Sequence, residues 1–545
     1  MRLQSDLIDP RQLLPGPEGR SFVQRDHVLF VGFSEQDNLG IGYIASVLLA
    51  AGMQPVIVDF RLGPEAIRNE ILAYQPRLVG FSIIFQYHIH KFRDLIGYLR
   101  ESGIHCHFTA GGHYPSLRYQ ELLGLIPELD SVVLFEGEYT CLELVKAIAA
   151  GQDWHQIQGI AYRDDGQIIA TPLRPLEPDL DTFPPPVRPP LREYVLGKKH
   201  ATILAGRGCL YNCSFCSIRQ FYSTPPGPLK RLRRPEMVVR EMELLHRQHD
   251  CAVFMFQDDD FPLAANTGKQ WTMTFCDLLE RSGLARNILW KVNCRPDEID
   301  REIFARMQSC GLYLVYLGIE CGTDEGLTLM NKRLTAATNS RGVEILKDLG
   351  IQYDYGFMLF DPGSTYPSVL ANIDFLERIC GDGSSPITFC KMLPYAETQI
   401  EQRLLAEGRL KGRTGFRDYG FLERSLDYFY TFLADSFNGW VGSRDGITNL
   451  ARWTRYYLAV ARKYYPDVPG LDAWESKVTD LIRQTNHYFF HAVRSMAPAF
   501  ADGVATDRYC EETAQGIGTA CSRYKRDFNA VIHEMEVAVT SSPAK

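Results

Sequence analysis

The sequence lacks an uninterrupted apolar stretch long enough to cross a lipid bilayer. Its first residues, MRLQSDLIDPRQLLPG, contain charges and prolines where a signal peptide needs a continuous apolar segment. These two absences argue against insertion into a membrane and against secretion. We therefore expect a cytoplasmic protein without a membrane span.

The sequence also lacks an excess of positive charge. It contains 58 lysine and arginine residues against 66 aspartate and glutamate residues, which gives a net charge of −8. This balance provides no overall basic field that would attract a nucleic-acid backbone. We therefore expect a small-molecule substrate and no nucleic-acid partner.

Closely spaced cysteines are absent from all but one segment. The 14 cysteines are spread through 545 residues, and no secretory signal precedes them. A disulfide framework is therefore not expected. Most of these cysteines lie singly in apolar stretches, which is typical of small buried hydrophobic side chains.

The chain is too long to fold around a single ordinary hydrophobic core, and the pattern of its apolar residues changes along the sequence. Residues 26–154 alternate short apolar runs with amphipathic stretches, which predicts a doubly wound, Rossmann-like parallel sheet. Residues 155–200 are rich in prolines and predict an ordered strap. In residues 201–395, six strand–helix units predict a partly open parallel barrel.

The two ends of the chain have other patterns. Residues 1–25 are expected to form an N-terminal arm. Residues 396–545 lose the strand rhythm, and their apolar residues recur at helical spacing, which predicts a mainly helical domain. The expected fold class is α/β, with a doubly wound domain, a partial (β/α)6 barrel and a helical C-terminal domain.

Three cysteines share one short segment, GRGCLYNCSFCSIRQFY. Cys209, Cys213 and Cys216 follow a predicted strand at intervals of four and three residues. Three thiolates on one loop can bind three irons of a cubane cluster and leave the fourth iron open. A molecule that offers an amine and a carboxylate can chelate this iron, and an electron from the cluster can then break a nearby carbon–sulfur bond.

Two other interpretations of these cysteines remain open. A structural zinc site needs four protein ligands, and no further Cys or His follows at short spacing. His246 and His249 lie farther along, on a predicted amphipathic helix. Buried free thiols are the second alternative, although they do not explain why three cysteines share one glycine-containing turn. The spacing favours the cluster.

The cysteine segment resembles the Cys-x3-Cys-x2-Cys hallmark of the radical S-adenosylmethionine (SAM) superfamily. In that hallmark an aromatic residue, here Phe215, precedes the last cysteine. The resemblance continues in order through the predicted barrel, and its segments are FQDDDF at 256–261, NCRPDEID at 293–300, YLGIECG at 316–322, LMNKRLT at 329–335 and LKDLGI at 346–351. It implies a 4Fe-4S cluster and SAM as cofactors, and an oxygen-sensitive enzyme.

The N-terminal part resembles the cobalamin-binding domain that precedes the barrel in one radical SAM subgroup. The segments DNLGIGYIASVLLAAG, LVGFS, AGGHYPS and FEGEYT match it in order. Ligand crevices in such sheets lie beyond the carboxyl ends of the strands, and a corrinoid needs backbone donors and small side chains there. The contacts that the resemblance implies are Asn38, Leu39, Gly40, Gly42, Ser82, Gly111, Gly112, Glu136 and Gly137.

The resemblance also implies contacts to SAM within the barrel. Asp258 or Asp259 would bind the SAM ammonium group. Arg295 would bind its carboxylate, Glu320 its ribose hydroxyls, and Phe215 would contact SAM beside the cluster. The ordinary alternatives are a solvated acidic turn and surface salt bridges.

Two positions depart from the patterns of relatives. The first loop, SEQDNLGIG, contains no histidine, so we expect no protein imidazole on cobalt and a lower face shielded near Ile83–Gln86. His88, His90 and His113 are rival ligands, for which helix capping or surface roles are the alternatives. Ser364 stands where relatives have a glutamate, so no ligand role is expected for it.

Relatives with this layout are commonly methyltransferases that act on unactivated carbon or phosphorus, and the group includes an anaerobic porphyrin-ring cyclase. The resemblance implies transfer of a methyl group from SAM through cobalamin to a small molecule, with an external electron donor of the flavodoxin or ferredoxin type. A radical cyclisation or rearrangement without methyl transfer is one alternative. Another is a noncatalytic protein that carries the cluster or the corrinoid, because a fold does not fix its ligand.

Overall fold

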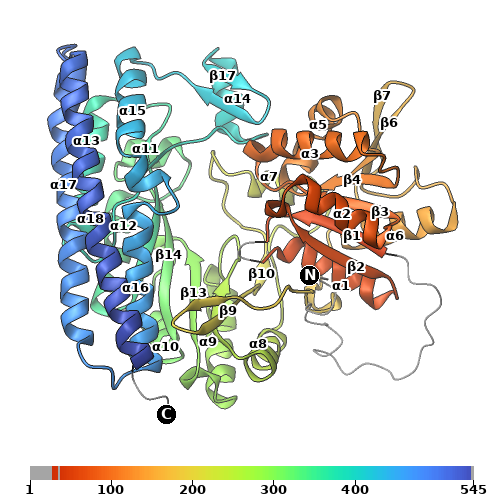
Figure 1. Ribbon diagram of the computed structural model, residues 1–545, viewed down its shortest axis with the longest axis horizontal. Coiled ribbons are helices and arrows are strands. Elements are labelled where there is room, and N and C mark those ends of the chain that lie inside the picture. Colours follow the sequence, from red (N-terminus) through yellow and green to blue (C-terminus); the bar gives the residue numbers. More distant parts are fainter. Residues whose placement is uncertain (1–26, 35–36, 542–545) are drawn as a thin grey trace.

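The computed structural model describes residues 27–34 and 37–541 of the chain. The first described strand begins at His27, so the predicted arm of residues 1–25 lies outside the described residues. The doubly wound domain lies at one side of the molecule and the long C-terminal helices lie at the other, with the barrel between them (Figure 1). No helix within the described ranges is long and apolar enough to span a membrane.

The first domain is a seven-stranded sheet in the order β2-β1-β3-β4-β5-β6-β7. Its five parallel strands are β1 (His27–Gly32), β2 (Gln54–Asp59), β3 (Leu78–Ser82), β4 (His107–Gly111) and β5 (Ser131–Val133). Helices α1 (Leu39–Ala50) and α6 (Glu138–Ala150) pack on one face, and α2 (Pro64–Tyr74) and α3 (Ile89–Glu101) pack on the other. The predicted doubly wound sheet is therefore confirmed.

Two further strands lengthen this sheet. Strands β6 (Ile160–Asp164) and β7 (Gln167–Ala170) form an antiparallel hairpin that pairs with β5. The hairpin turns at Asp165 (φ 44°) and Gly166 (φ 79°), and an Asp-Gly pair with positive φ is typical of such turns. Residues 160–170 thus form strands within the segment where the sequence analysis expects a strap.

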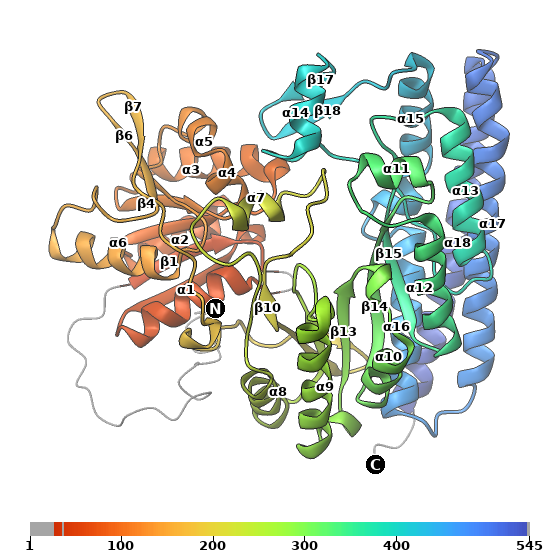
Figure 2. The ribbon, with the colours of Figure 1, turned by 180° about the vertical axis from the view of Figure 1, so that it is seen from behind.

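The second domain is a curled, partly open barrel. Its parallel strands are β9 (Lys198–Ile203), β12 (Cys251–Phe256), β13 (Leu289–Cys294), β14 (Leu312–Glu320), β15 (Gln352–Phe360) and β16 (Cys390–Lys391), with β8 (Glu193–Val195) antiparallel at the edge. Helices α8 (Pro235–His249), α9 (Ala265–Arg281), α10 (Arg301–Ser309), α12 (Ala336–Asp348) and α13 (Tyr366–Cys380) follow its convex side (Figure 2). The six predicted strand–helix units are confirmed as a half-barrel.

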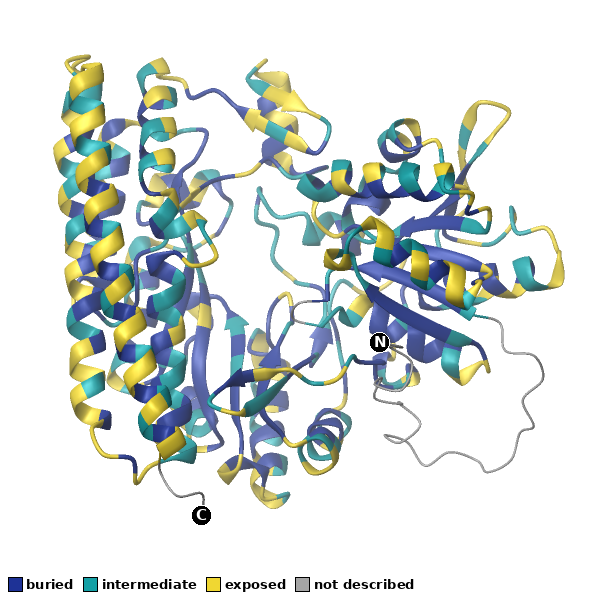
Figure 3. Ribbon diagram, viewed as in Figure 1, coloured by how far each residue is buried: buried dark blue, intermediate teal, exposed yellow. Residues whose placement is uncertain are grey.

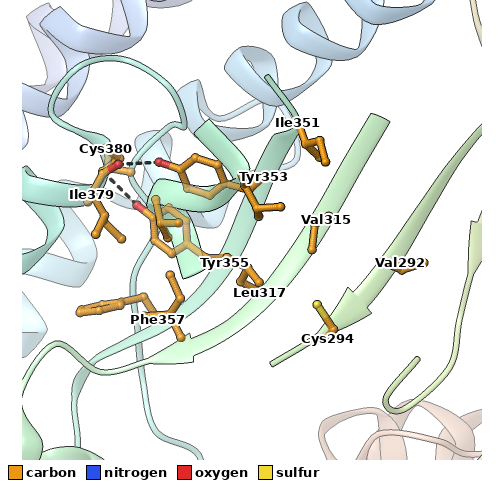
Figure 4. Packing of buried hydrophobic residues seen from close by; sticks show 14 of the residues in the cluster. Val292, Cys294, Val315, Leu317, Ile351, Tyr353, Tyr355, Phe357, Ile379 and Cys380 are labelled. Carbon is orange, nitrogen blue, oxygen red and sulfur yellow. Dashed lines mark hydrogen bonds between the residues drawn. The ribbon is translucent and has the colours of Figure 1, made fainter. Parts of the chain in front are cut away.

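Alternate residues of the barrel strands form the core beneath these helices. Val315 and Leu317 of β14 pack with Tyr353 and Tyr355 of β15 on the convex face (Figure 4). The Tyr353 hydroxyl donates a hydrogen bond to the carbonyl of Ile379, near the end of α13. Because side chains alternate along a strand, the residues between these face the concave side.

The C-terminal region is mainly helical, as predicted. It contains α14 (Gln399–Ala406), a small hairpin of β17 (Leu410–Arg413) and β18 (Phe416–Tyr419), α15 (Arg424–Ser436), α16 (Ile447–Tyr464), α17 (Leu471–Ala501) and α18 (Asp507–Ser541). Val460 of α16 packs with Leu289 and Leu314 of the barrel. The barrel strands are largely buried and the outer faces of the long helices are exposed (Figure 3).

The segment 394–420 also reaches the first domain. Gln86, just before α3, donates a hydrogen bond to the Pro394 carbonyl (3.3 Å), and His90 lies 2.8 Å from the Thr414 carbonyl. Arg118 forms an ion pair of 2.6 Å with Glu401 of α14. The first domain is therefore attached to the rest of the chain at this side as well as through the strap.

Buried ion pairs hold the proline-rich strap in place. Arg188 of the strap is 1% exposed and contacts Glu241 of α8 (2.7 Å) and Asp37 of the first domain (3.2 Å). Arg233 joins the other oxygen of Glu241 (2.7 Å) to Asp181 (3.2 Å). Each buried charge thus has an opposite charge beside it, which is the condition for burying it without a large loss of stability.

We predict that Arg188→Met lowers the free energy of unfolding by about 3–5 kcal/mol, because Asp37 loses its ion-pair partner and the buried Glu241 keeps only Arg233. Arg234→Met is a matched control, since Arg234 is 65% exposed and pairs with the same Asp181 as Arg233 does. Its effect is expected to stay within about 1 kcal/mol. Urea unfolding followed by circular dichroism measures both, and equal losses would contradict the prediction.

Candidate functional site

The three-cysteine loop lies between β10 (Gly206–Arg207) and α7 (Ile218–Ser223). Gly208 opens the loop with φ +84°, and a Cβ there would lie 1.9 Å from the Leu229 carbonyl oxygen. Backbone contacts then fix the loop: Ser214 N–H donates to the Met330 carbonyl (2.9 Å), and the Asn331 amide donates to the Asn212 carbonyl (2.7 Å). The loop is thus fixed to the segment that follows α11 (Asp324–Leu329).

The thiols of this loop are half-buried and form no disulfide. Burial raises the pKa of Cys209 and of Cys216 to about 12, so without a cation both thiols hold their protons at neutral pH. A bound metal stabilises the thiolate instead, because its charge offsets the cost of burial. Partly buried thiols gathered on one fixed loop are therefore a donor set that suits iron.

The spacing of these thiols bears on which metal group they can hold. Within residues 27–34 and 37–541, no three Cys, His, Asp or Glu side chains gather closely enough to hold a single ion. A cubane cluster distributes its thiolates over separate irons, so it requires a wider spacing than one zinc ion does.

Asp258 and Asp259 hold the backbone that leads into this loop. Asp258 accepts hydrogen bonds from the N–H groups of Ala205 (3.1 Å) and Gly206 (2.7 Å), and Asp259 accepts one from Gly208 (3.0 Å). Burial raises the pKa of Asp258 to about 7 and that of Asp259 to about 6. Both oxygens of Asp258 are engaged with the backbone, whereas Asp259 also reaches a cavity beside the loop.

The other residues predicted to contact SAM lie around the same loop. The Arg295 guanidinium stacks on Tyr211 at 3.8 Å, bonds Asp297 (2.9 Å), and has a buried Nη1 with no hydrogen-bond partner among the described residues. Glu320 ends β14 with φ +67°, and burial raises the pKa of its carboxyl. Phe215 packs against the barrel core. The structure thus brings these side chains near the cysteines.

A cavity of about 480 Å³ lies between the strand ends of the first domain and the β10–α7 segment of the barrel. Eight of the nine predicted cobalamin contacts line it, and they are Asn38, Leu39, Gly40, Ser82, Gly111, Gly112, Glu136 and Gly137. Asn38 caps α1 and its amide reaches the Ser82 hydroxyl (3.4 Å). The volume of the cavity and its mainly apolar wall are typical of a cofactor pocket.

Gly42 is the exception, because it is not among the residues that line this cavity. The residue faces the strap, where its carbonyl accepts a hydrogen bond from Val187 N–H (3.0 Å). A Cβ at this position would lie 2.7 Å from the Val187 carbonyl oxygen. The glycine therefore permits close packing of α1 against the strap, and it does not line the cavity.

The cavity wall near the predicted shield is hydrophobic. Ile84 and Phe85 line the cavity and remain 39% and 45% exposed, whereas Ile83 is fully buried. Gln86 turns away and bonds the Pro394 carbonyl. Two exposed apolar side chains facing a cavity indicate a surface that a ligand would cover.

His113, which the sequence offers as a rival cobalt ligand, lines the cavity. Its ring lies 4.2 Å from that of Phe221 in α7, and its buried Nε2 has no hydrogen-bond partner among the described residues. Burial lowers the pKa of His113 to about 4, so the ring is neutral at physiological pH. An unpaired polar atom in the wall is consistent with a ligand that would bond it.

Arginines of the barrel form ion pairs with glutamates of the first domain beside this cavity. Arg207 contacts Glu136 (3.1 Å) and Glu138 (2.6 Å), and Arg231 contacts Glu136 (2.7 Å). The carboxylate of Glu136 is therefore engaged in ion pairs at the cavity edge. These ion pairs could not be predicted from the sequence, because the arginines and the glutamates lie about 70 to 95 residues apart.

The chain matches two protein families. Residues 28–145 match the B12 binding domain, and residues 203–376 match the Radical SAM superfamily. An anaerobic magnesium-protoporphyrin IX monomethyl ester cyclase of Rubrivivax gelatinosus is 31% identical over 333 residues, 58% of each chain. A hopanoid C-3 methylase of Methylococcus capsulatus is 27% identical over 332 residues, 58% of this chain and 60% of the methylase.

The solved structure of the cobalamin-dependent SAM radical enzyme OxsB, with aqua-cobalamin and SAM bound, has a similar fold. Its TM-score is 0.66 at 16% identity, and the match covers 95% of this chain and 84% of OxsB. The chain spans about three fifths of the length of the two curated relatives. The two family matches lie in order on the two α/β domains, and the chain therefore belongs to the radical SAM enzymes that carry an N-terminal B12-binding domain.

Proposed function

We propose that this chain is a cobalamin-dependent radical SAM methyltransferase that moves a methyl group from SAM to an unactivated carbon or phosphorus of a small molecule. One observation carries the proposal: the cysteine loop and the cavity share the segment 206–209. Gly206 and Arg207 line the cavity, and Cys209 follows two residues later. A cluster and a corrinoid bound at these places would be held by one rigid piece of backbone.

The residues around these two places have defined tasks in this proposal. Cys209, Cys213 and Cys216 hold the 4Fe-4S cluster. Asp259 rather than Asp258 receives the SAM ammonium, because the oxygens of Asp258 already accept two backbone hydrogen bonds. Arg295 binds the SAM carboxylate through its free Nη1, with Glu320 toward the ribose and Phe215 beside the cluster. When bound, the cluster supplies the electron that cleaves SAM and cobalamin carries the methyl group.

The cavity residues would bind cobalamin. The glycines at positions 40, 111, 112 and 137 form part of the cavity wall, so backbone lies at the surface that the corrinoid would contact. We propose that Ile84 and Phe85 cover the lower face and that no protein imidazole coordinates cobalt. His113 would instead form a hydrogen bond to the bound molecule. A corrinoid that shows nitrogen hyperfine coupling from a protein histidine would contradict this arrangement.

The proposal also includes a partner and a compartment. An external donor of the flavodoxin or ferredoxin type would deliver single electrons to the cluster. The cysteines of the chain are free thiols, which favours the reducing cytoplasm. The net charge of −8 provides no field for a nucleic acid.

A second candidate function is a radical cyclisation or rearrangement without methyl transfer. The 31% identity to the anaerobic cyclase favours it, whereas the likeness to the hopanoid C-3 methylase favours methyl transfer. Both functions use the same cluster and the same cavity. The fate of the SAM methyl group therefore separates them.

We predict that SAM with a carbon-13 methyl group labels the enzyme's cobalamin under reducing, oxygen-free conditions. Mass spectrometry of the extracted corrinoid checks this without knowledge of the substrate. Unlabelled cobalamin together with deoxyadenosine would support cyclisation or rearrangement. A reconstituted protein that forms no deoxyadenosine with any reductant or substrate would support a noncatalytic carrier.

Alanine at Cys209, Cys213 or Cys216 is expected to remove the cubane cluster, because each thiolate would bind a separate iron. Iron and sulfide content after anaerobic reconstitution, together with deoxyadenosine formation, measures the loss. Cys510→Ala, on α18 and outside the loop, is the control and should keep both properties. Full cluster content in a triple alanine variant would rule out this assignment.

Filling the cavity should prevent corrinoid binding. We expect Ser82→Phe to lower cobalamin affinity at least about tenfold, because a bulky side chain occupies space that the ligand needs. Absorbance of cobalamin retained after gel filtration measures the change, and cluster content should not change. Ser102→Phe, at the end of α3 and away from the cavity, is the control. Equal cobalamin retention by the two variants would place the corrinoid elsewhere.

A further inference from the structure

The concave face of the barrel carries a lysine that forms no direct ion pair among the described residues. On β13, Val292 and Cys294 pack on the convex side (Figure 4), so Lys291 faces the concave side by the alternation of the strand. Its Nζ lies 5.9 Å from the ring of Tyr316 on β14. Within the described part of the chain, Lys291 forms no ion pair, and burial lowers the pKa of its ammonium.

A second cation faces Lys291 from the C-terminal domain. Arg452 of α16 is 21% exposed, and its Nε is buried without a hydrogen-bond partner among the described residues. The nearest carboxylate is Asp354 of β15, at 3.8 Å. Arg455 holds that carboxylate more closely (2.7 Å), and the Tyr456 hydroxyl also donates to it. Asp354 therefore neutralises only part of the positive charge.

A second carboxylate near this face, that of Glu320, does not balance the positive charge of Lys291. Glu320, at the end of β14, lies 3.8 Å from the ammonium of Lys332. One carboxylate, Asp354, thus faces three cations: Lys291, Arg452 and Arg455. A buried ammonium without a partner is costly, so a site built in this way favours an anion.

Solvent reaches this face, which leaves it accessible to a ligand. Tyr316 is 36% exposed although it lies in the middle of a central strand. Cys390 of β16, on the same sheet, is also exposed. β14 is a central strand and β16 is the edge strand, so solvent reaches the sheet at both places.

We propose that Lys291, Tyr316 and Arg452 bind an oxyanion of the substrate, a carboxylate or a phosphoryl group. This inference rests on the proposed function, in which the substrate enters the barrel. The two cations and the phenol hydroxyl provide charge-assisted and neutral donors to the same oxygens. Arg295, assigned to SAM, lies four residues farther along the chain, just past the end of β13, which is about 13 Å for an extended strand. The oxyanion site is therefore distinct from the SAM carboxylate site.

The test uses the holoenzyme with cluster, cobalamin and saturating SAM, so that the SAM site is filled. Calorimetric titration with inorganic phosphate and with glutarate measures anion binding, and the tighter of the two indicates a phosphoryl or a carboxylate substrate. Lys291→Met is expected to weaken this binding at least about tenfold, because a charged hydrogen bond is lost. Lys291→Arg should retain most of it. Lys477→Met, on the exposed face of α17, is the control and should bind as the wild type does.

The following outcomes distinguish a failure of the oxyanion site from a failure of the proposed methyl transfer. Equal anion affinity in the wild type and in Lys291→Met, or no binding of either anion, overturns the inference. Weaker SAM binding by Lys291→Met with unchanged anion binding also overturns it. Tyr316→Phe keeps its ring and removes only the hydroxyl, so a loss of affinity in a folded variant supports the site independently. Anion binding that depends on Lys291 in a protein that labels no cobalamin would reject methyl transfer and keep the oxyanion site.

Discussion

The candidate site depends on the hydrogen bonds between two strand-end carboxylates and the backbone of residues 205–208. Asp258 and Asp259 accept the N–H groups of Ala205, Gly206 and Gly208, and so fix the chain just before the first cysteine. The same short segment forms part of the cavity wall. Because the two carboxylates follow directly after β12, the position of the loop is tied to the barrel sheet itself.

Buried ion pairs then set the position of the first domain against this segment. Arg207 and Arg231 form ion pairs with Glu136 and Glu138 at the cavity edge. Arg188 of the strap connects the domains at a second place through its ion pair with Asp37. Such pairs contribute little net stability when burial costs are counted, but they strongly disfavour arrangements that separate the charges. Their effect here is to define how the two domains meet.

Much of this fold could be predicted from the sequence because its signals are local. The alternation of apolar runs predicts both sheets, and the three cysteines lie within one segment that needs no tertiary information. Contacts between distant segments could not be predicted in this way. The sequence suggests that Gly42 belongs to a ligand-binding loop, whereas in the structure it packs against Val187 of the strap. The Arg207–Glu138 pair, the His113–Phe221 contact and the charge left on Lys291 likewise depend on packing between elements far apart in sequence.

The attachment of segment 394–420 to the first domain, opposite the strap, closes the chain into a ring of contacts around the cavity. The bonds of Gln86 and Arg118 are fewer and less buried than those of Arg188. The attachment through segment 394–420 is therefore the weaker of the two, and the strap is the firmer connection between the domains.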